Sequence, residues 1–116
     1  MGDTRARMTV HGPLGDDTVE ALVDTGATFT KISSSVAEKV GFKRRRQVEV
    51  VLANGGKVSR QLGSLEVEIA SQKDVVPVTV GEDGEADFVG YTTLEILGFK
   101  VDPVARKLEP SPPIEY

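Results

Sequence analysis

Residues 21–28, Ala-Leu-Val-Asp-Thr-Gly-Ala-Thr, place an acid at the end of an apolar run that is typical of a β-strand. Burying a carboxylate is costly unless it is hydrogen-bonded or functional, so Asp24 is the first candidate for chemistry. Gly26 allows the backbone to turn tightly, which brings N–H groups toward that carboxylate. A plain strand end followed by an Asp-Thr-Gly turn is the alternative, and the tripeptide alone does not exclude it.

The composition limits the chemistry that could accompany Asp24. The 116 residues suffice for one domain with its own core, and they include no Cys and one His. These counts exclude disulfide frameworks and thiol catalysis and leave almost no basis for zinc or iron–sulfur sites. We therefore expect chemistry carried by side-chain oxygens, with no metal and no cofactor.

Charge and hydropathy argue against two classes of partner. The net charge of -4 opposes nucleic-acid binding, because such binding relies on neutralising phosphates. No apolar run reaches the roughly 18 residues of a membrane span, and the N-terminal region carries charges where a signal peptide would be apolar. We expect a cytoplasmic protein that binds neither nucleic acid nor membrane.

Short runs rich in Val and Thr, separated by Gly, Asp and Pro, predict many short strands and a mostly β fold. Residues 65–69 alternate apolar and acidic side chains, so the apolar set is expected to face the core. Asn54-Gly55-Gly56 lies between two further runs and predicts a hairpin with a type I′ turn.

Two capping boxes predict two short helices. Residues 35–38 (Ser-Val-Ala-Glu) and 92–95 (Thr-Thr-Leu-Glu) form the boxes, and Gly41 and Gly98 are placed to end the helices. Both glycines begin a Gly-Phe-Lys tripeptide, and they lie 57 residues apart. This spacing favours an internal duplication into two similar halves, with chance similarity as the alternative.

We expect residues 1–109 to form a single domain, since no linker or low-complexity block interrupts them. Residues 110–116 are rich in Pro, which predicts an exposed, extended C-terminal tail.

Three motifs stand in the order seen in retropepsin-like aspartic proteases. Residues 23–28 (Val-Asp-Thr-Gly-Ala-Thr) come first, Asn54-Gly55-Gly56 follows, and Phe88-Val89-Gly90 precedes the second predicted helix. The chain most resembles the small stand-alone prokaryotic members of that group, over residues 5–109. The resemblance implies an all-β, single-lobe acid protease barrel with one or two short helices.

The resemblance also assigns roles around the Asp-Thr-Gly motif. It makes Asp24 the catalytic carboxylate and places the Gly26 N–H on it. Thr25 would bond across to the matching loop of a second subunit, and Ala27 and Thr28 would contact the substrate.

The other two motifs take supporting roles in the same resemblance. Asn54, Gly55 and Gly56 would form the tip of a flap that closes over an extended peptide. Phe88-Val89-Gly90 would pack beneath the active-site loop, as structure rather than chemistry.

Hydrolysis of an amide by two Asp groups needs one carboxylate to take a proton from water and one carboxylic acid to protonate the carbonyl oxygen. Two carboxyls about 3 Å apart cannot both ionise easily, so they share one proton. The chain has one Asp-Thr-Gly, and a second copy must come from a second chain. We expect a homodimeric aspartic endopeptidase that hydrolyses peptide or protein substrates with a water nucleophile. The alternative is a non-catalytic dimeric binding or scaffolding module with the same fold.

Three features depart from the family pattern. Tyr91 follows Gly90 where many relatives carry Arg or another polar residue that braces the dimer. The Pro-rich tail disfavours interleaved terminal strands beyond residues 107–109. Lys57 and Arg60 lie near the flap, where they would either favour acidic peptide substrates or simply keep an exposed hairpin solvated.

Three other signals receive plainer interpretations. The basic run at residues 43–46 is expected to be a solvated loop, and residues 81–87 lack the spacing of a calcium loop and are expected to be an acidic turn. His11 and the serines at 33–35 are not expected to form a hydrolase triad, because no Gly-x-Ser-x-Gly elbow exists.

Overall fold

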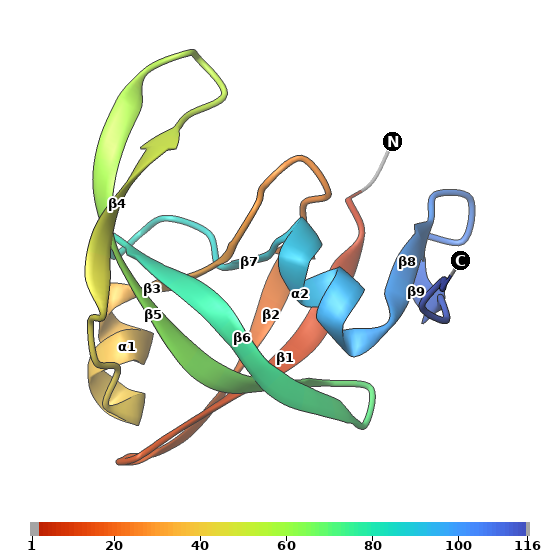
Figure 1. Cartoon of the computed structure of the whole chain (residues 1–116), viewed down its shortest axis with the longest axis horizontal. Helices are drawn as coiled ribbons and strands as arrows, with labels where there is room; N and C mark the ends of the chain where they lie inside the picture. The colour runs from red at the N-terminus through yellow and green to blue at the C-terminus, as the bar shows by residue number, and fades with distance from the viewer. Residues whose placement is uncertain (1–2, 116) are drawn as a thin grey trace.

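A computed structural model describes residues 3–115, in which strands dominate and two short helices interrupt them (Figure 1). In chain order, the elements are β1 (Arg5–Gly12), β2 (Gly15–Val23), β3 (Thr30–Ser33), α1 (Ser34–Val40), β4 (Arg46–Val51), β5 (Lys57–Ile69), β6 (Gln72–Gly81), β7 (Phe88–Val89), α2 (Tyr91–Leu97), β8 (Phe99–Asp102) and β9 (Lys107–Pro110). The predicted all-β fold with two short helices is confirmed.

Most strands belong to one curled sheet. Seven strands follow the order β1-β2-β7-β3-β6-β5-β4, and β1 also pairs with β5, which joins strands from opposite sides of the sheet. The apolar side chains of residues 65–69 are buried and the acidic ones are partly exposed, as their alternation predicts. The buried core is mainly aliphatic and includes the fully buried Met8, Val10, Ile32, Val67, Val78 and Val89.

The chain consists of two similar halves. Each half contains a hairpin, a loop, a short strand and a helix: β1, β2, β3 and α1 in the first, and β5, β6, β7 and α2 in the second. β2 and β6 begin 57 residues apart, and so do α1 and α2. Each short strand pairs in parallel with the second hairpin strand of the other half, β3 with β6 and β7 with β2. The predicted duplication is therefore present in the topology.

The C-terminal ends of both helices match the sequence prediction, and their N-terminal ends do not. Gly41 and Gly98 cap α1 and α2 with φ of 81° and 80°, as predicted. The N-cap of α1 is Ser33 rather than Ser35, because the Ser33 hydroxyl accepts from Val36 N at 3.4 Å. α2 has Gly90 at its N-cap and no side-chain cap, so the second capping box is wrong.

The turn at residues 54–56 also differs from expectation. The hairpin around residues 54–56 exists, but its turn is not type I′, because Gly55 has φ of 85° and Asn54 has no positive φ. Gly55 N donates to Leu52 O, and Asn54 Oδ1 accepts from Gly56 N at 2.8 Å. The hydrogen bond to the Asn54 side chain stabilises a turn that is longer than the two-residue turn predicted from the Asn-Gly pair. The turn with positive φ at both central residues lies between β5 and β6, at Ala70 and Ser71.

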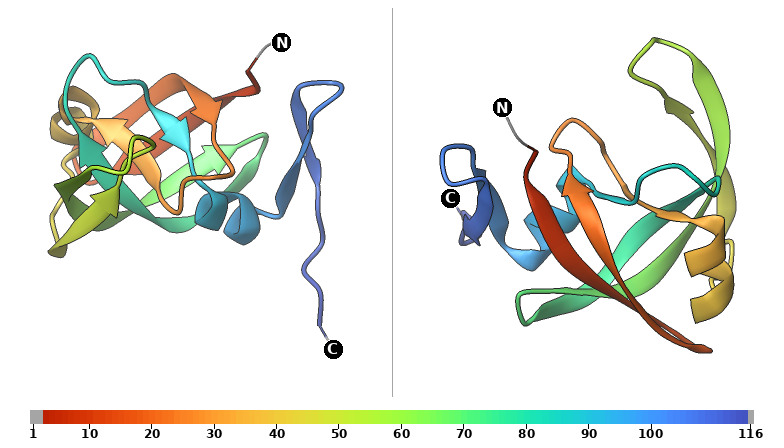
Figure 2. Two further views of the ribbon diagram at one scale, coloured as in Figure 1. Left: turned by 90° about the horizontal axis from the view of Figure 1, so that it is seen from above. Right: turned by 180° about the vertical axis from the view of Figure 1, so that it is seen from behind.

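The C-terminal region forms its own small sheet. β8 and β9 pair antiparallel, and Ser111 N donates to Gly98 O at 2.7 Å. Residues 111–115 extend away from the body of the molecule (Figure 2), and Tyr116, the end of the predicted tail, lies outside the described residues. Neither helix within residues 3–115 has the length and hydropathy needed to cross a membrane.

Candidate active site

Asp24 lies in the loop that joins β2 to β3, directly after the last residue of β2. Its side chain is exposed, and its Oδ1 accepts from Gly26 N at 3.0 Å. The Asp24 backbone is fixed on both sides, since its N–H donates to Val89 O at 2.9 Å and its carbonyl accepts from Ala27 N at 3.1 Å. As predicted, a carboxylate follows an apolar strand, and a backbone N–H donates to one of the carboxylate oxygens.

The loop rests on the start of α2. Tyr91 N donates to Ala27 O at 2.7 Å, and Thr92 N donates to Thr28 O at 3.1 Å. These bonds satisfy N–H groups at the start of a helix, which is why α2 needs no side-chain cap. The loop and the helix therefore hold each other in place.

Gly90 fits tightly beneath the loop. A Cβ at this position would lie 2.4 Å from the carbonyl oxygen of Phe29, a distance that no side chain tolerates. Gly90 N donates to the Thr30 hydroxyl at 3.1 Å, and that hydroxyl donates to Thr93 Oγ1 at 2.6 Å. The segment Phe88-Val89-Gly90 packs under the loop of Asp24 as expected. The buried Thr30–Thr93 pair is an addition that sequence reasoning missed.

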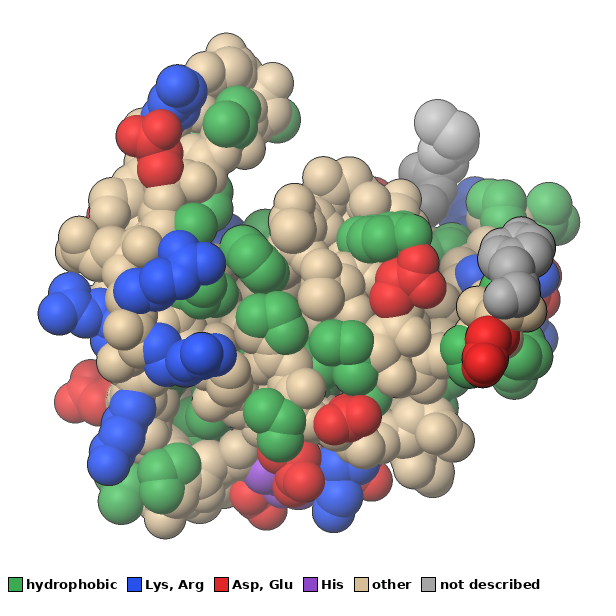
Figure 3. All heavy atoms as spheres, viewed as in Figure 1, with side chains coloured by type: hydrophobic (Ala, Val, Ile, Leu, Met, Phe, Trp, Pro, Cys, Tyr) green, Lys and Arg blue, Asp and Glu red, His purple; other side chains and the backbone are tan. Residues whose placement is uncertain are grey.

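A cleft of about 480 Å³ opens between this loop and the β4–β5 hairpin. Figure 3 shows the hairpin standing apart from the body, with a hollow between them. Of the predicted site residues, Gly26, Ala27 and Thr28 line the cleft. Asp24 and Thr25 are exposed beside it and are not among its lining residues.

The predicted flap residues lie at the far end of the hairpin. Asn54, Gly55 and Gly56 are exposed and do not line the cleft in this chain. The hairpin contributes Val50, Val51 and Leu52 to the cleft wall instead. The predicted flap tip therefore lies beyond the part of the hairpin that lines the cleft.

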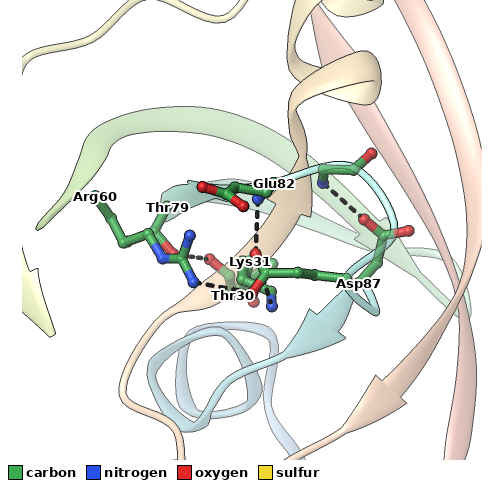
Figure 4. A network of polar contacts seen from close by, with 8 residues as sticks. Thr30, Lys31, Arg60, Thr79, Glu82 and Asp87 are labelled. Carbon is green, nitrogen blue, oxygen red and sulfur yellow. Dashed lines mark hydrogen bonds and ion pairs between the residues drawn. The ribbon is translucent and has the colours of Figure 1, made fainter. Parts of the chain in front are cut away.

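A charged network forms another part of the cleft wall (Figure 4). Arg60 on β5 donates to Glu85 Oε2 at 3.2 Å, and Lys31 Nζ on β3 lies 3.8 Å from Glu85 Oε1. Glu85 Oε1 also accepts from Glu82 N at 2.6 Å. That backbone hydrogen bond, helped by Arg60 and Lys31 and opposed by partial burial, lowers the pKa of Glu85 below its usual value.

The acidic loop between β6 and β7 has a structural use beyond a solvated turn. Asp83 accepts from Ser35 N at 2.9 Å and Asp87 accepts from Ser33 N at 2.8 Å, so two carboxylates hold the start of α1. The Ser35 N–H lowers the pKa of Asp83. No cluster of acidic or His side chains within residues 3–115 is arranged to hold a metal ion.

The other polar and basic residues that the sequence analysis discussed have structural roles or are exposed. His11 contacts Asp16 and Glu68, while the Ser33 hydroxyl caps α1, so they do not form a triad. The basic run at residues 43–46 is exposed and leads into β4. Tyr91 is exposed, and its hydroxyl donates to Glu95 on its own helix, which raises the pKa of Tyr91.

An Asp-Thr-Gly loop that is held by a buried strand and helix, beside a cleft bordered by a long hairpin, defines the class as one lobe of a retropepsin-like aspartic protease. Sequence comparison agrees, because the family model for aspartyl protease matches residues 6–101. The chain belongs to this family. A comparison with curated proteins finds no match.

Proposed function

We propose that this protein is an aspartic endopeptidase that acts as a homodimer, with one Asp24 from each chain. The observation that carries the proposal is the exposed Asp24 carboxylate with Gly26 N at 3.0 Å, in a chain of the aspartyl protease family. The duplicated halves add a reason for dimerisation. Gly81 is the residue 57 positions after Asp24, so the matching place in the second half has no carboxylate.

Two Asp24 groups that face each other across a dimer axis would share one proton. The ionised carboxylate would take a proton from a water molecule, whose oxygen attacks the peptide carbonyl carbon. The protonated partner would donate its proton to the carbonyl oxygen. Collapse of the resulting tetrahedral intermediate, with a proton passed to the leaving nitrogen, breaks the C–N bond.

The remaining predicted residues have supporting roles in this proposal. Thr25 would bond to the partner's loop, and Ala27 and Thr28 would contact the backbone of the bound peptide. Asn54, Gly55 and Gly56 would close over that peptide as a flap. Main-chain hydrogen bonds to an extended peptide would supply affinity, and side-chain pockets would supply selectivity.

The function is tested by the Asp24→Asn variant, which keeps the size of the side chain and removes its acid–base chemistry. We expect peptide hydrolysis to fall by about 1000-fold or more, with dimerisation retained in sedimentation measurements. Asp74→Asn is the matched control, because Asp74 is exposed on β6 and, within residues 3–115, its carboxylate accepts only from Val75 N next to it. It should leave hydrolysis unchanged.

Hydrolysis that survives Asp24→Asn would remove Asp24 from the mechanism. A wild-type dimer that cleaves no member of a diverse peptide library from acid to neutral pH would favour the binding-module alternative instead. A protein that stays monomeric at micromolar concentration would contradict both.

A further inference from the structure

Two long cationic side chains are withdrawn from solvent at the wall of the cleft. The side chain of Lys31 is 12% exposed and that of Arg60 is 11% exposed, although such side chains normally extend into water. They come from different strands, β3 and β5, and reach into the same network (Figure 4). The sequence left two interpretations of Arg60, a preference for acidic peptides or the solvation of an exposed hairpin, and its low exposure in the cleft wall argues against the second.

The negative charge in this network is smaller than the positive charge. Glu85 is the carboxylate that lies between the two cations, and Arg60 donates a hydrogen bond to its Oε2 at 3.2 Å. Its Oε1 is already bonded to Glu82 N, and Lys31 Nζ is 3.8 Å away, beyond hydrogen-bond length. One carboxylate therefore faces two cations.

The Lys31 ammonium is left with donors to spare. It lies 4.8 Å from the centre of the Phe88 ring, which attracts the cation without accepting a conventional hydrogen bond. Within residues 3–115, no side-chain or backbone oxygen accepts a hydrogen bond from Lys31 Nζ. An ammonium has three donors, so this group can receive a carboxylate from outside the chain.

The other charges of the cleft do not cancel this surplus. Glu49 on β4 also lines the cleft, but its side chain is 68% exposed and its carboxylate lies 3.8 Å from Lys57 Nζ. That pair is on the hairpin and faces solvent. The excess of one positive charge thus remains at Lys31 and Arg60, in the same cleft that Gly26, Ala27 and Thr28 line.

We propose that Lys31 makes this cleft selective for peptides that place an Asp or Glu side chain in it, with Arg60 and Glu85 positioning the ammonium. The inference rests on the proposed peptidase function and names the substrate class of that site. A substrate carboxylate would form a charge-assisted hydrogen bond with Lys31 in a partly desolvated setting, where such bonds are stronger than in water.

The test is a set of fluorogenic octapeptides in which Glu or Gln is placed at each position in turn. We expect wild-type kcat/KM to favour Glu over Gln by about tenfold at one position and to be indifferent elsewhere. The preference should fade as pH falls through about 4.3, where a Glu side chain becomes protonated. Equal kcat/KM values for the Glu and Gln peptides at every position would overturn the proposal from measurements on the wild-type protein alone.

Substitutions then assign the preference to Lys31. Lys31→Met should bring the Glu/Gln ratio close to one, Lys31→Glu should shift the preference toward a peptide with Lys, and Lys31→Arg should keep it. Lys73→Met is the matched control, since Lys73 is an exposed lysine on β6 outside the cleft lining, and this variant should leave the ratio unchanged. Circular dichroism checks that each variant is folded. A Glu preference that persists in a folded Lys31→Met protein would assign recognition elsewhere and overturn the proposal.

A binding measurement separates this inference from the peptidase proposal. Fluorescence anisotropy of the labelled Glu and Gln peptides with Asp24→Asn reports recognition without cleavage. Tighter binding of the Glu peptide that depends on Lys31 supports the acidic subsite even if the wild-type protein hydrolyses nothing. Hydrolysis without a Glu preference would retain the peptidase and overturn the subsite, and equal binding of both peptides would also overturn it.

Discussion

Thr30 connects the loop of Asp24 to the second half of the molecule through a small hydroxyl. Its Oγ1 accepts from Gly90 N and donates to Thr93 Oγ1, and all three residues are buried. Leaving a buried N–H without a partner costs about 1–3 kcal/mol, so these bonds strongly favour one arrangement of the loop. The position of the Asp24 carboxylate therefore depends on a residue that does no chemistry itself.

His11 provides a pH dependence that can be measured apart from activity. Its Nδ1 lies 2.8 Å from Asp16 Oδ1 and its Nε2 lies 3.1 Å from Glu68 Oε1. The hydrogen bond to Asp16, then that to Glu68, raises the pKa of His11 above 6.5 in the folded state. The stabilisation is fully present below about pH 6.5 and is lost as pH rises through the raised folded pKa.

We expect His11→Gln to lower the free energy of unfolding by about 0.5–1 kcal/mol at about pH 5.5, and by less at about pH 9. Urea unfolding at both pH values measures the difference. Arg7→Gln, on an exposed position of the same strand, is the control and should show no such pH dependence. An equal loss at the two pH values would show that His11 contributes packing rather than charge.

Individual residues of the candidate site could be identified from the sequence when their interaction partners are close to them in the chain. Asp24 and Gly26 could be identified because the carboxylate and the N–H that holds it are two residues apart. Thr30 and Lys31 could not, because their partners Thr93 and Glu85 lie far along the chain. Their sequence context is that of ordinary strand residues.

The β5–β6 turn offers a prediction at the scale of an element. Ala70 and Ser71 have φ of 48° and 70°, a conformation that costs L-residues about 1–2 kcal/mol and that Asn and Gly adopt more easily. We expect the double variant Ala70→Asn, Ser71→Gly to raise the free energy of unfolding by about 1 kcal/mol in urea titrations. Gly55→Ala, which puts a side chain on a backbone with φ of 85°, should lower it by a similar amount. A double variant no more stable than wild type would contradict the strain assigned to this turn.

The elements themselves show which signals can be read from a sequence. The alternation at residues 65–69 and the glycines at 41 and 98 were reliable, because periodic burial and a left-handed helix end are set by nearby residues. The N-termini of both helices were wrong. Ala27 and Thr28 supply carbonyl partners to α2, and Asp83 and Asp87 hold α1, so distant contacts replaced the predicted boxes.

At the scale of the whole molecule, the duplication explains why one chain is expected to supply half a site. The two halves exchange their short strands, β3 with β6 and β7 with β2, so the loop of one half is supported by the other. They are not equivalent in chemistry, since Asp24 in the first half corresponds to Gly81 in the second. In the proposed mechanism, the second carboxylate therefore comes from a second copy of the chain.

The most direct test of this account is activity after the wild-type protein is mixed with Asp24→Asn, unfolded together in urea and refolded so that subunits exchange. If each site needs an Asp24 from both chains, a ninefold excess of the variant at constant total protein should lower hydrolysis per wild-type chain by about tenfold, because most wild-type chains then have an inactive partner. Wild-type protein refolded alone at the same total concentration is the control. Activity per wild-type chain that stays constant across all mixing ratios would show that one chain forms a complete site, and would contradict the shared pair of Asp24 carboxylates.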